Sequence, residues 1–154
     1  MHKALQLRVP PLLLTLIVAA LMLLSHHIIG GSIDSGLIGL SLGLALGALG
    51  LAMAGAGFLS FLLRKTTPNP IDVHAASELV TNGLYRISRN PMYLGMLLLL
   101  AGLAVYLGNA LSFVLCGAFV WYLNEFQIKP EEHAMENLFG AQFIAYRARV
   151  RRWI

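Results

Sequence analysis

Four long apolar runs, separated by short polar stretches, constrain this chain more than any other feature of its sequence. The runs cover about residues 10–29, 37–63, 91–107 and 110–127. A helix needs roughly 20 apolar residues to cross the hydrocarbon core of a bilayer, and the first two runs are long enough. Only Gly108-Asn109 separates the last two, which predicts a tight helical hairpin that spans with little tilt or with local thinning. We therefore expect an all-α, polytopic membrane bundle of four transmembrane helices with a C-terminal helical hairpin.

The composition supports lipid as the main solvent of this chain. Hydrophobic residues make up 58% of the sequence and charged residues 12%, against roughly 25% charged residues in an ordinary soluble domain. A chain of 154 residues buries too little of its surface to hide that excess inside a globule. The single cysteine, Cys116, lies within an apolar run and excludes both an intrachain disulfide and a cysteine-based metal site.

The basic residues predict the orientation of the bundle. In a four-span arrangement, all eleven Lys and Arg residues fall on one side, and the opposite loops, residues 25–36 and 108–109, contain none. The positive-inside rule then places both termini in the cytoplasm, in an inner (plasma) membrane. Aromatic residues are not interleaved with these bases, so we expect contacts with membrane lipid and no nucleic-acid binding. The first run lacks a small-x-small cleavage site and is expected to remain as a helix.

Glycines recur on one face of the second run. Gly39, Gly43 and Gly47 follow one another at four-residue spacing, which lines one face of a helix and lets another backbone approach closely. The partner is expected to be another helix, either within the chain or in a second copy, so a homo-oligomer through this face is a candidate assembly. No strand precedes these glycines, which argues against a phosphate-binding loop.

The polar residues that could carry chemistry lie in two segments, residues 64–90 and 129–154. In the first, Asn82-Gly83 predicts a turn, and Asn90-Pro91 predicts an N-cap followed by the first residue of a helix. In the second, Pro130-Glu131-Glu132 predicts the start of another helix. The stretch from residue 138 onward is an amphipathic cytoplasmic tail, which either lies on the membrane surface or folds back over the cytoplasmic ends of the helices.

These segments contain none of the usual soluble catalytic motifs. There is no Walker loop, dinucleotide fingerprint, nucleophile elbow or paired-histidine zinc motif. His133 with Glu132 and Glu136 lacks a second matching motif, and we expect no metal site. The free N–H groups at the start of the third run suit an electron-rich group, and the two adjacent glutamates suit hydroxyls, an amine or a sulfonium. The alternative is a capped helix flanked by snorkelling arginines.

Three blocks of residues together resemble a known family. They are Gly83-x-Tyr85-xxx-Arg89-Asn90-Pro91-x-Tyr93-x-Gly95, then Glu131-Glu132, and finally Phe139-Gly140-xx-Phe143-xx-Tyr146-xxx-Val150-x-Arg152. In order and spacing they resemble the isoprenylcysteine carboxyl methyltransferase family of membrane enzymes, in a bacterial-type member. The resemblance covers residues 77–153, and the first two runs match that family only in hydrophobicity.

The resemblance implies a pocket for S-adenosyl-L-methionine on the cytoplasmic side. Ser77 and Asn90 both stand where eukaryotic members have a histidine, which changes the hydrogen bonding of the pocket more than its plan. The whole chain, 1–154, would form a single methyltransferase domain, with two N-terminal helices in 1–63 and the cofactor-binding part in 64–154. The residues carried over as cofactor contacts are Glu78, Leu79, Val80, Tyr85, Asn90, Pro91, Met92, Tyr93 and Glu131.

Gln127 departs from the family where the methyl acceptor would lie. Carboxyl-methylating members carry an arginine at this position, and a glutamine cannot form a charge-assisted bidentate pair with a carboxylate. Glu125 and Glu131 flank Gln127, so we expect a neutral or cationic acceptor on a lipophilic body that enters from the bilayer. Gln127 and Arg89 are the candidate catalytic residues, and Arg89 is the alternative partner for a carboxylate.

Two other functions remain open from the sequence. An NADPH-dependent sterol-type reductase resembles the same C-terminal blocks more loosely, and bound nicotinamide would identify it. A non-enzymatic helix-packing or assembly protein is suggested by the glycine face, and it predicts no cofactor binding.

Overall fold

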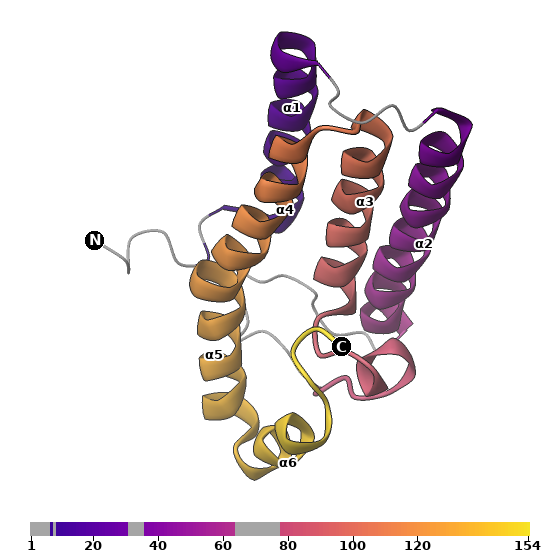
Figure 1. The fold of residues 1–154 in the computed structure, drawn as a ribbon. Helices are drawn as coiled ribbons and strands as arrows, with labels where there is room; N and C mark the ends of the chain where they lie inside the picture. The colour runs from indigo at the N-terminus through magenta and orange to yellow at the C-terminus, as the bar shows by residue number, and fades with distance from the viewer. Residues whose placement is uncertain (1–6, 8, 31–35, 64–77) are drawn as a thin grey trace.

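The computed structural model describes residue 7 and residues 9–30, 36–63 and 78–154. It confirms the all-α class: within these residues the chain forms helices and no strands (Figure 1). The expected cytoplasmic residues 64–77, including Ser77, lie outside the described part. The elements are α1 Pro11–Ile29, α2 Gly36–Leu63, η3 Gly83–Arg86, α3 Pro91–Leu107, α4 Ala110–Tyr122, η4 Leu123–Ile128, α5 Lys129–Phe139 and α6 Ala141–Arg149.

The first four α-helices alternate in direction and form the bundle (Figure 1). α3 lies between α2 and the pair α1 and α4. Three helices, Pro11–Ile29, Gly36–Leu63 and Ala110–Phe139, are long and apolar enough to cross a membrane. α3, Pro91–Leu107, is apolar but shorter, with 17 residues. The protein is therefore a multi-pass membrane protein, and a complete fourth span remains a prediction.

Glycines bring α2 and α3 into backbone contact. A Cβ added at Gly43 would lie 2.8 Å from the carbonyl oxygen of Gly102, and one added at Gly50 would lie 2.6 Å from that of Gly95. No side chain larger than hydrogen fits such an approach. At Gly47, by contrast, an added Cβ meets nothing within 4 Å. Gly43 and Gly50 of α2 thus pack within the chain, the Cβ position of Gly47 is open, and association of two copies through the Gly39, Gly43 and Gly47 face remains a prediction.

The turn between α3 and α4 is the expected tight hairpin. Gly108 ends α3 in the left-handed conformation, with φ of 58°, which glycine adopts without steric cost. The side chain of Asn109 accepts a hydrogen bond from the backbone N–H of Leu111 at 2.8 Å and donates one to the carbonyl of Gly30 at 3.0 Å. The hairpin is thereby attached to the end of α1.

The structure corrects the prediction that a new helix starts at Pro130. α4, η4 and α5 form one continuous helix, in which η4 is a π-helical segment and its flanking residues keep helical dihedrals. A proline has no N–H to bond the carbonyl four residues earlier and clashes with it. That carbonyl, of Phe126, instead accepts a hydrogen bond from the backbone N–H of Leu7 at 3.0 Å. The wider π turn lets the helix pass Pro130 without breaking.

The amphipathic tail packs against the segment before α3, and its position relative to the membrane surface remains a prediction. α6 buries Phe143 and Tyr146, and the hydroxyl of Tyr146 donates a hydrogen bond to the carbonyl of Tyr85 at 2.7 Å. Val150 then leaves the helix in an extended conformation. The chain returns past the base of α3 (Figure 1).

Candidate functional site

A hydrogen-bonded cluster of three polar side chains joins the base of α3 to the long helix opposite. The hydroxyl of Tyr93, in the first turn of α3, donates a hydrogen bond to Oε1 of Glu131 at 2.6 Å. The amide Nε2 of Gln127 donates to the same oxygen at 2.5 Å. Gln127 is only 2% exposed, so the cluster is an internal feature. Three residues that the sequence assigned to one site are thus brought together.

The helix geometry explains why Gln127 and Glu131 meet. Residues four apart lie on the same helix face, and the π-helical segment that ends at Ile128 orients this face toward the interior. Oε1 of Glu131 accepts both hydrogen bonds, whereas Oε2 has no hydrogen bond to any residue that the structure describes. A carboxylate oxygen prefers several donors. The Oε2 atom therefore offers an acceptor position to a ligand.

Tyr85 lies near Glu131, on the segment before α3. It lies in η3, which begins with Gly83 at φ of 61°, as the Asn82-Gly83 turn predicted. The ring of Tyr85 packs edge-on against Phe61 of α2, with centroids 5.4 Å apart. Burial raises the pKa of Tyr85 well above its ordinary range, and nearby Tyr146 and Glu131 raise it further. Tyr85 is therefore a neutral hydroxyl near Glu131.

The entry to α3 differs in one respect from the predicted cap. Asn90 is the N-cap residue and Pro91 the first residue of the helix, as expected, but the Asn90 side chain makes no capping hydrogen bond. Its Nδ2 instead donates to the carbonyl of Arg152 at 2.9 Å. Ser88 Oγ accepts from the backbone N–H of Asn90 at 3.1 Å. The side chain of Asn90 therefore does not cap the free backbone N–H groups at the start of α3.

Arg89 and Glu132 form an ion pair beside the cluster. Nη2 of Arg89 lies 2.8 Å from Oε1 of Glu132, and Arg152 approaches the other oxygen at 2.6 Å. The side chains of Arg89 and Glu132 are only 10% and 13% exposed. Burial lowers the pKa of Arg89 from its usual value, and the charge of Glu132 opposes that shift. Both oxygens of Glu132 are therefore bonded to arginines, whereas Oε2 of Glu131 has no hydrogen bond to a described residue.

Four other predicted contacts lie in the segment before α3 or in its first turn. Val80 is buried, Leu79 is half-buried and Glu78 is exposed. Met92 faces α2, because its Cγ would lie 2.7 Å from a Cβ added at Gly57. Their roles as cofactor contacts remain predictions.

Several residues of the site had no assigned role in the sequence. Arg152 and Tyr146 belong to the third motif block. The sequence signal that could have identified Arg152 is the excess of arginine in the segment after the Glu131-Glu132 pair. Trp153 Nε1 donates to Oδ1 of Asn124 at 3.2 Å. Nothing in the spacing of these last two residues predicts that contact, because it joins segments 29 residues apart.

A family model described as phospholipid methyltransferase matches residues 38–142, from early α2 to the start of α6. The fold and site are those of a helical membrane protein with a polar cluster at one end of its bundle. The chain belongs to the phospholipid methyltransferase family.

Several curated relatives match part of the chain. Protein-S-isoprenylcysteine O-methyltransferase B of Arabidopsis thaliana is 38% identical over 73 residues, which are 47% of this chain and 37% of that protein. The Schizosaccharomyces pombe protein-S-isoprenylcysteine O-methyltransferase is 29% identical over 111 residues, or 72% of this chain and 44% of that protein. An uncharacterized protein of Haemophilus influenzae is 40% identical over 63 residues, 41% of this chain and all of that protein. No solved structure matches.

The aligned part thus spans less than half the length of the two named methyltransferases.

Proposed function

We propose that this protein transfers a methyl group from S-adenosylmethionine to a lipophilic acceptor at the cytoplasmic face of the membrane. The observation that carries the proposal is the buried cluster of Tyr93, Gln127 and Glu131, where the apolar bundle meets the polar tail. Membership of the phospholipid methyltransferase family supports the reaction type. The names of the relatives support a lipid-anchored acceptor, since isoprenylcysteine, like a phospholipid, carries a lipophilic body.

The cluster suits the cofactor chemically. Oε2 of Glu131 would accept from an amine or hydroxyl, or lie near a sulfonium charge. The backbone N–H groups in the first turn of α3, free of a cap from Asn90, would receive a carboxylate. The bound cofactor supplies an activated methyl sulfonium. Tyr93 and Gln127 hold the Glu131 carboxylate in place, and the buried surroundings exclude water.

The acceptor is proposed to be neutral or cationic at the reacting atom. Gln127 brings no positive charge, and its amide is committed to Glu131. Arg89, the alternative partner of a carboxylate, already pairs with Glu132. An unpaired anion delivered from lipid would therefore remain desolvated beside Glu131, which is costly. An amine, thiol or hydroxyl on a lipophilic body meets no such penalty.

The binding test uses calorimetric titration of detergent-purified protein with S-adenosylhomocysteine. Glu131→Ala and Tyr93→Phe should weaken binding by about 1–3 kcal/mol, the range for a lost buried hydrogen-bond partner. His133→Ala is the matched control, since His133 is exposed on the same helix and should leave affinity unchanged. Equal effects of all three variants would refute the residue assignment. Binding of NADPH in place of the adenosyl compound would favour the reductase, and binding of neither would favour the assembly protein.

The acceptor test uses labelled S-adenosylmethionine with the unmodified protein. A neutral or amine-containing lipid extract should be labelled faster than a prenylcysteine analogue. Efficient carboxyl methylation of the analogue would refute the proposed acceptor class and return Arg89 to the role of carboxylate partner.

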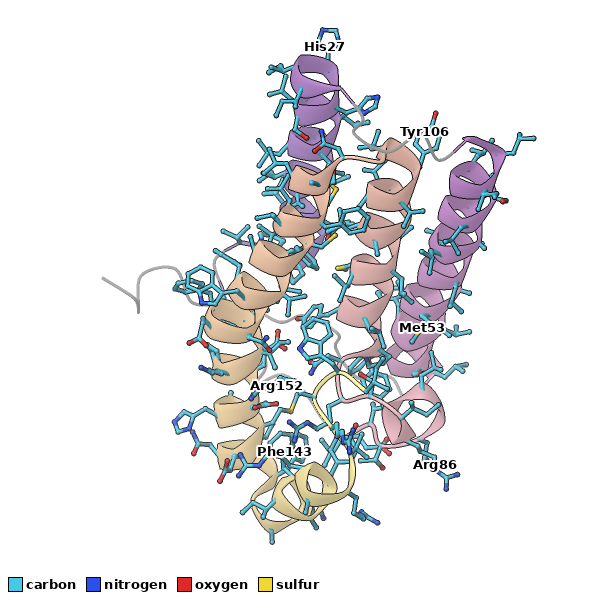
Figure 2. All side chains as sticks on the ribbon, viewed as in Figure 1. His27, Met53, Arg86, Tyr106, Phe143 and Arg152 are labelled. Carbon is cyan, nitrogen blue, oxygen red and sulfur yellow. The ribbon has the colours of Figure 1, made fainter. Side chains whose placement is uncertain are left out.

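In the proposed orientation the protein lies in an inner (plasma) membrane, with both termini in the cytoplasm. Figure 2 supports it, because Arg86 and Arg152 lie toward one end of the molecule, and His27 and Tyr106 toward the other. Reporter fusions at Ile154 and after Ser32 should therefore report opposite sides of the membrane. Fusions that report the same side would exclude the four-span arrangement.

A further inference from the structure

The last residues of the chain connect the two halves of the candidate site. After α6 ends, Val150 is extended, and residues 151–153 pass between the entry of α3 and the long helix formed by α4, η4 and α5. Figure 1 shows this yellow segment crossing beside the base of α3. We call residues 150–153 the strap.

On one side, backbone carbonyls of the strap hold the segment before α3. The carbonyl of Arg151 accepts a hydrogen bond from the backbone N–H of Arg89 at 3.0 Å. The carbonyl of Arg152 accepts from Asn90 Nδ2 at 2.9 Å and from Ser88 Oγ at 3.4 Å. These bonds fix the residues that lead into the first turn of α3, only three positions before Tyr93.

On the other side, side chains of the strap hold the long helix. Nε and Nη2 of Arg152 donate to the two carboxylate oxygens of Glu132, at 3.0 and 2.6 Å. This two-point geometry is specific to arginine. Trp153 donates to Asn124 on the π-helical segment at 3.2 Å and packs against the buried core of the bundle.

The two anchored segments carry the two sides of the candidate pocket. Tyr93 follows the segment held by strap carbonyls, and Glu131 lies between Asn124 and Glu132, the residues held by strap side chains. The 2.6 Å contact of Tyr93 with Glu131 requires the two helices to keep a fixed separation at this level. The strap spans that separation with partners on both sides.

We propose that the strap positions the cofactor site, and that Arg152 and Trp153 are positioning residues that act through Asn90 and Glu131. The proposal rests on the proposed cofactor binding, and it adds a requirement: an intact pocket needs the strap bonded to both segments. The strap is thus a specific structural determinant of affinity, separate from the residues that would touch the cofactor.

The test combines hydrogen exchange of the ligand-free protein with titration by S-adenosylhomocysteine. In Arg152→Ala and Trp153→Phe, the amide of Arg89 should exchange faster, because the strap carbonyl that protects it is no longer held. Affinity for S-adenosylhomocysteine should fall about tenfold, the effect of losing a charge-assisted or buried hydrogen bond. Arg152→Lys keeps the charge with one bond and should recover part of the affinity. Arg149→Ala is the matched control, since among the described residues its side chain bonds only within α6.

Each outcome decides the proposal. Faster exchange with weaker binding, recovered in part by Arg152→Lys, supports it. Unchanged exchange, or faster exchange with unchanged affinity, overturns it. If Arg152→Ala does not fold, Trp153→Phe and Arg152→Lys give the same decision. Failure of the unmodified protein to bind S-adenosylhomocysteine refutes the proposed function instead, and exchange at Arg89 still reports whether the strap holds.

Discussion

The α2–α3 interface and the junction beneath it hold helices together by opposite means. Between α2 and α3, glycines remove side chains so that backbones touch, with Gly50 against Gly95 as the closest example. At the junction, charged and polar side chains bridge a wider gap, with Glu132 bound by two arginines. The α2–α3 contact depends on close packing of two helix backbones, whereas the junction depends on ion pairs and directed hydrogen bonds between side chains.

The difference follows from the solvent at each level. Lipid gives helices no hydrophobic reason to associate, so close van der Waals packing through small residues is what stabilises α2 against α3. At the junction the alternative partner is water, and buried polar groups are stable only when each has a partner. Charged side chains that bond one another are therefore concentrated at one end of the bundle.

Removing the carboxylate of Glu132, which Arg89 and Arg152 share, should have the largest effect on stability. Glu132→Ala leaves Arg89 and Arg152 without their carboxylate. Breaking a buried ion pair costs about 3–5 kcal/mol, and we expect about 3 kcal/mol because Arg152 is 31% exposed and water partly compensates. The free energy of unfolding in mixed micelles measures this loss. Glu136→Ala, which removes a more exposed pair with Arg147, is the control, and an equal loss there would contradict the prediction.

Adding a methyl group at the glycine contact should have the next largest effect. In Gly50→Ala the new Cβ would meet the carbonyl of Gly95 at 2.6 Å, so the helices must separate, at a cost of about 1–3 kcal/mol for overpacking. Gly55→Ala meets nothing within 4 Å and should be neutral or slightly stabilising through helix propensity. The free energies of unfolding of these two variants, measured under the same conditions, test this prediction. If they behave alike, backbone contact does not hold α2 to α3.

Removing one hydroxyl from the tail should have the smallest effect. Tyr146→Phe loses the hydrogen bond to the carbonyl of Tyr85 but keeps the buried ring. We expect about 0.5–1.5 kcal/mol of destabilisation, the net value of one such bond. Burial raises the pKa of Tyr146 to about 12, so the hydroxyl stays protonated and the loss should be constant from pH 6 to 9. A loss that varies across this range would show that another group mediates the contact.

The sequence alone determined the parts of this protein that depend on local pattern. Continuous apolar runs predicted α1, α2 and α3 to within one residue at each end, and the first residue of α4, because a backbone in lipid must satisfy its own hydrogen bonds and can do so only as a helix. The fourth run was expected to end at residue 127, but the helix continues to Phe139. Gly108-Asn109 and Asn82-Gly83 predicted turns because glycine accepts positive φ at no cost. The family resemblance assigned Tyr93 and Glu131 to the cofactor and Gln127 to the methyl acceptor, and the structure brings these three side chains together.

Only the tertiary structure decided which polar groups meet. Asn90 was expected to cap α3 with its side chain, but the returning strap offers the carbonyl of Arg152, and the amide bonds there instead. Pro130 was expected to start a helix, but the π turn and Leu7 satisfy the carbonyl it leaves unbonded. Local preference gives each polar group several possible partners of similar energy. The choice among them depends on which distant segment is packed nearby, and a local pattern does not contain that information.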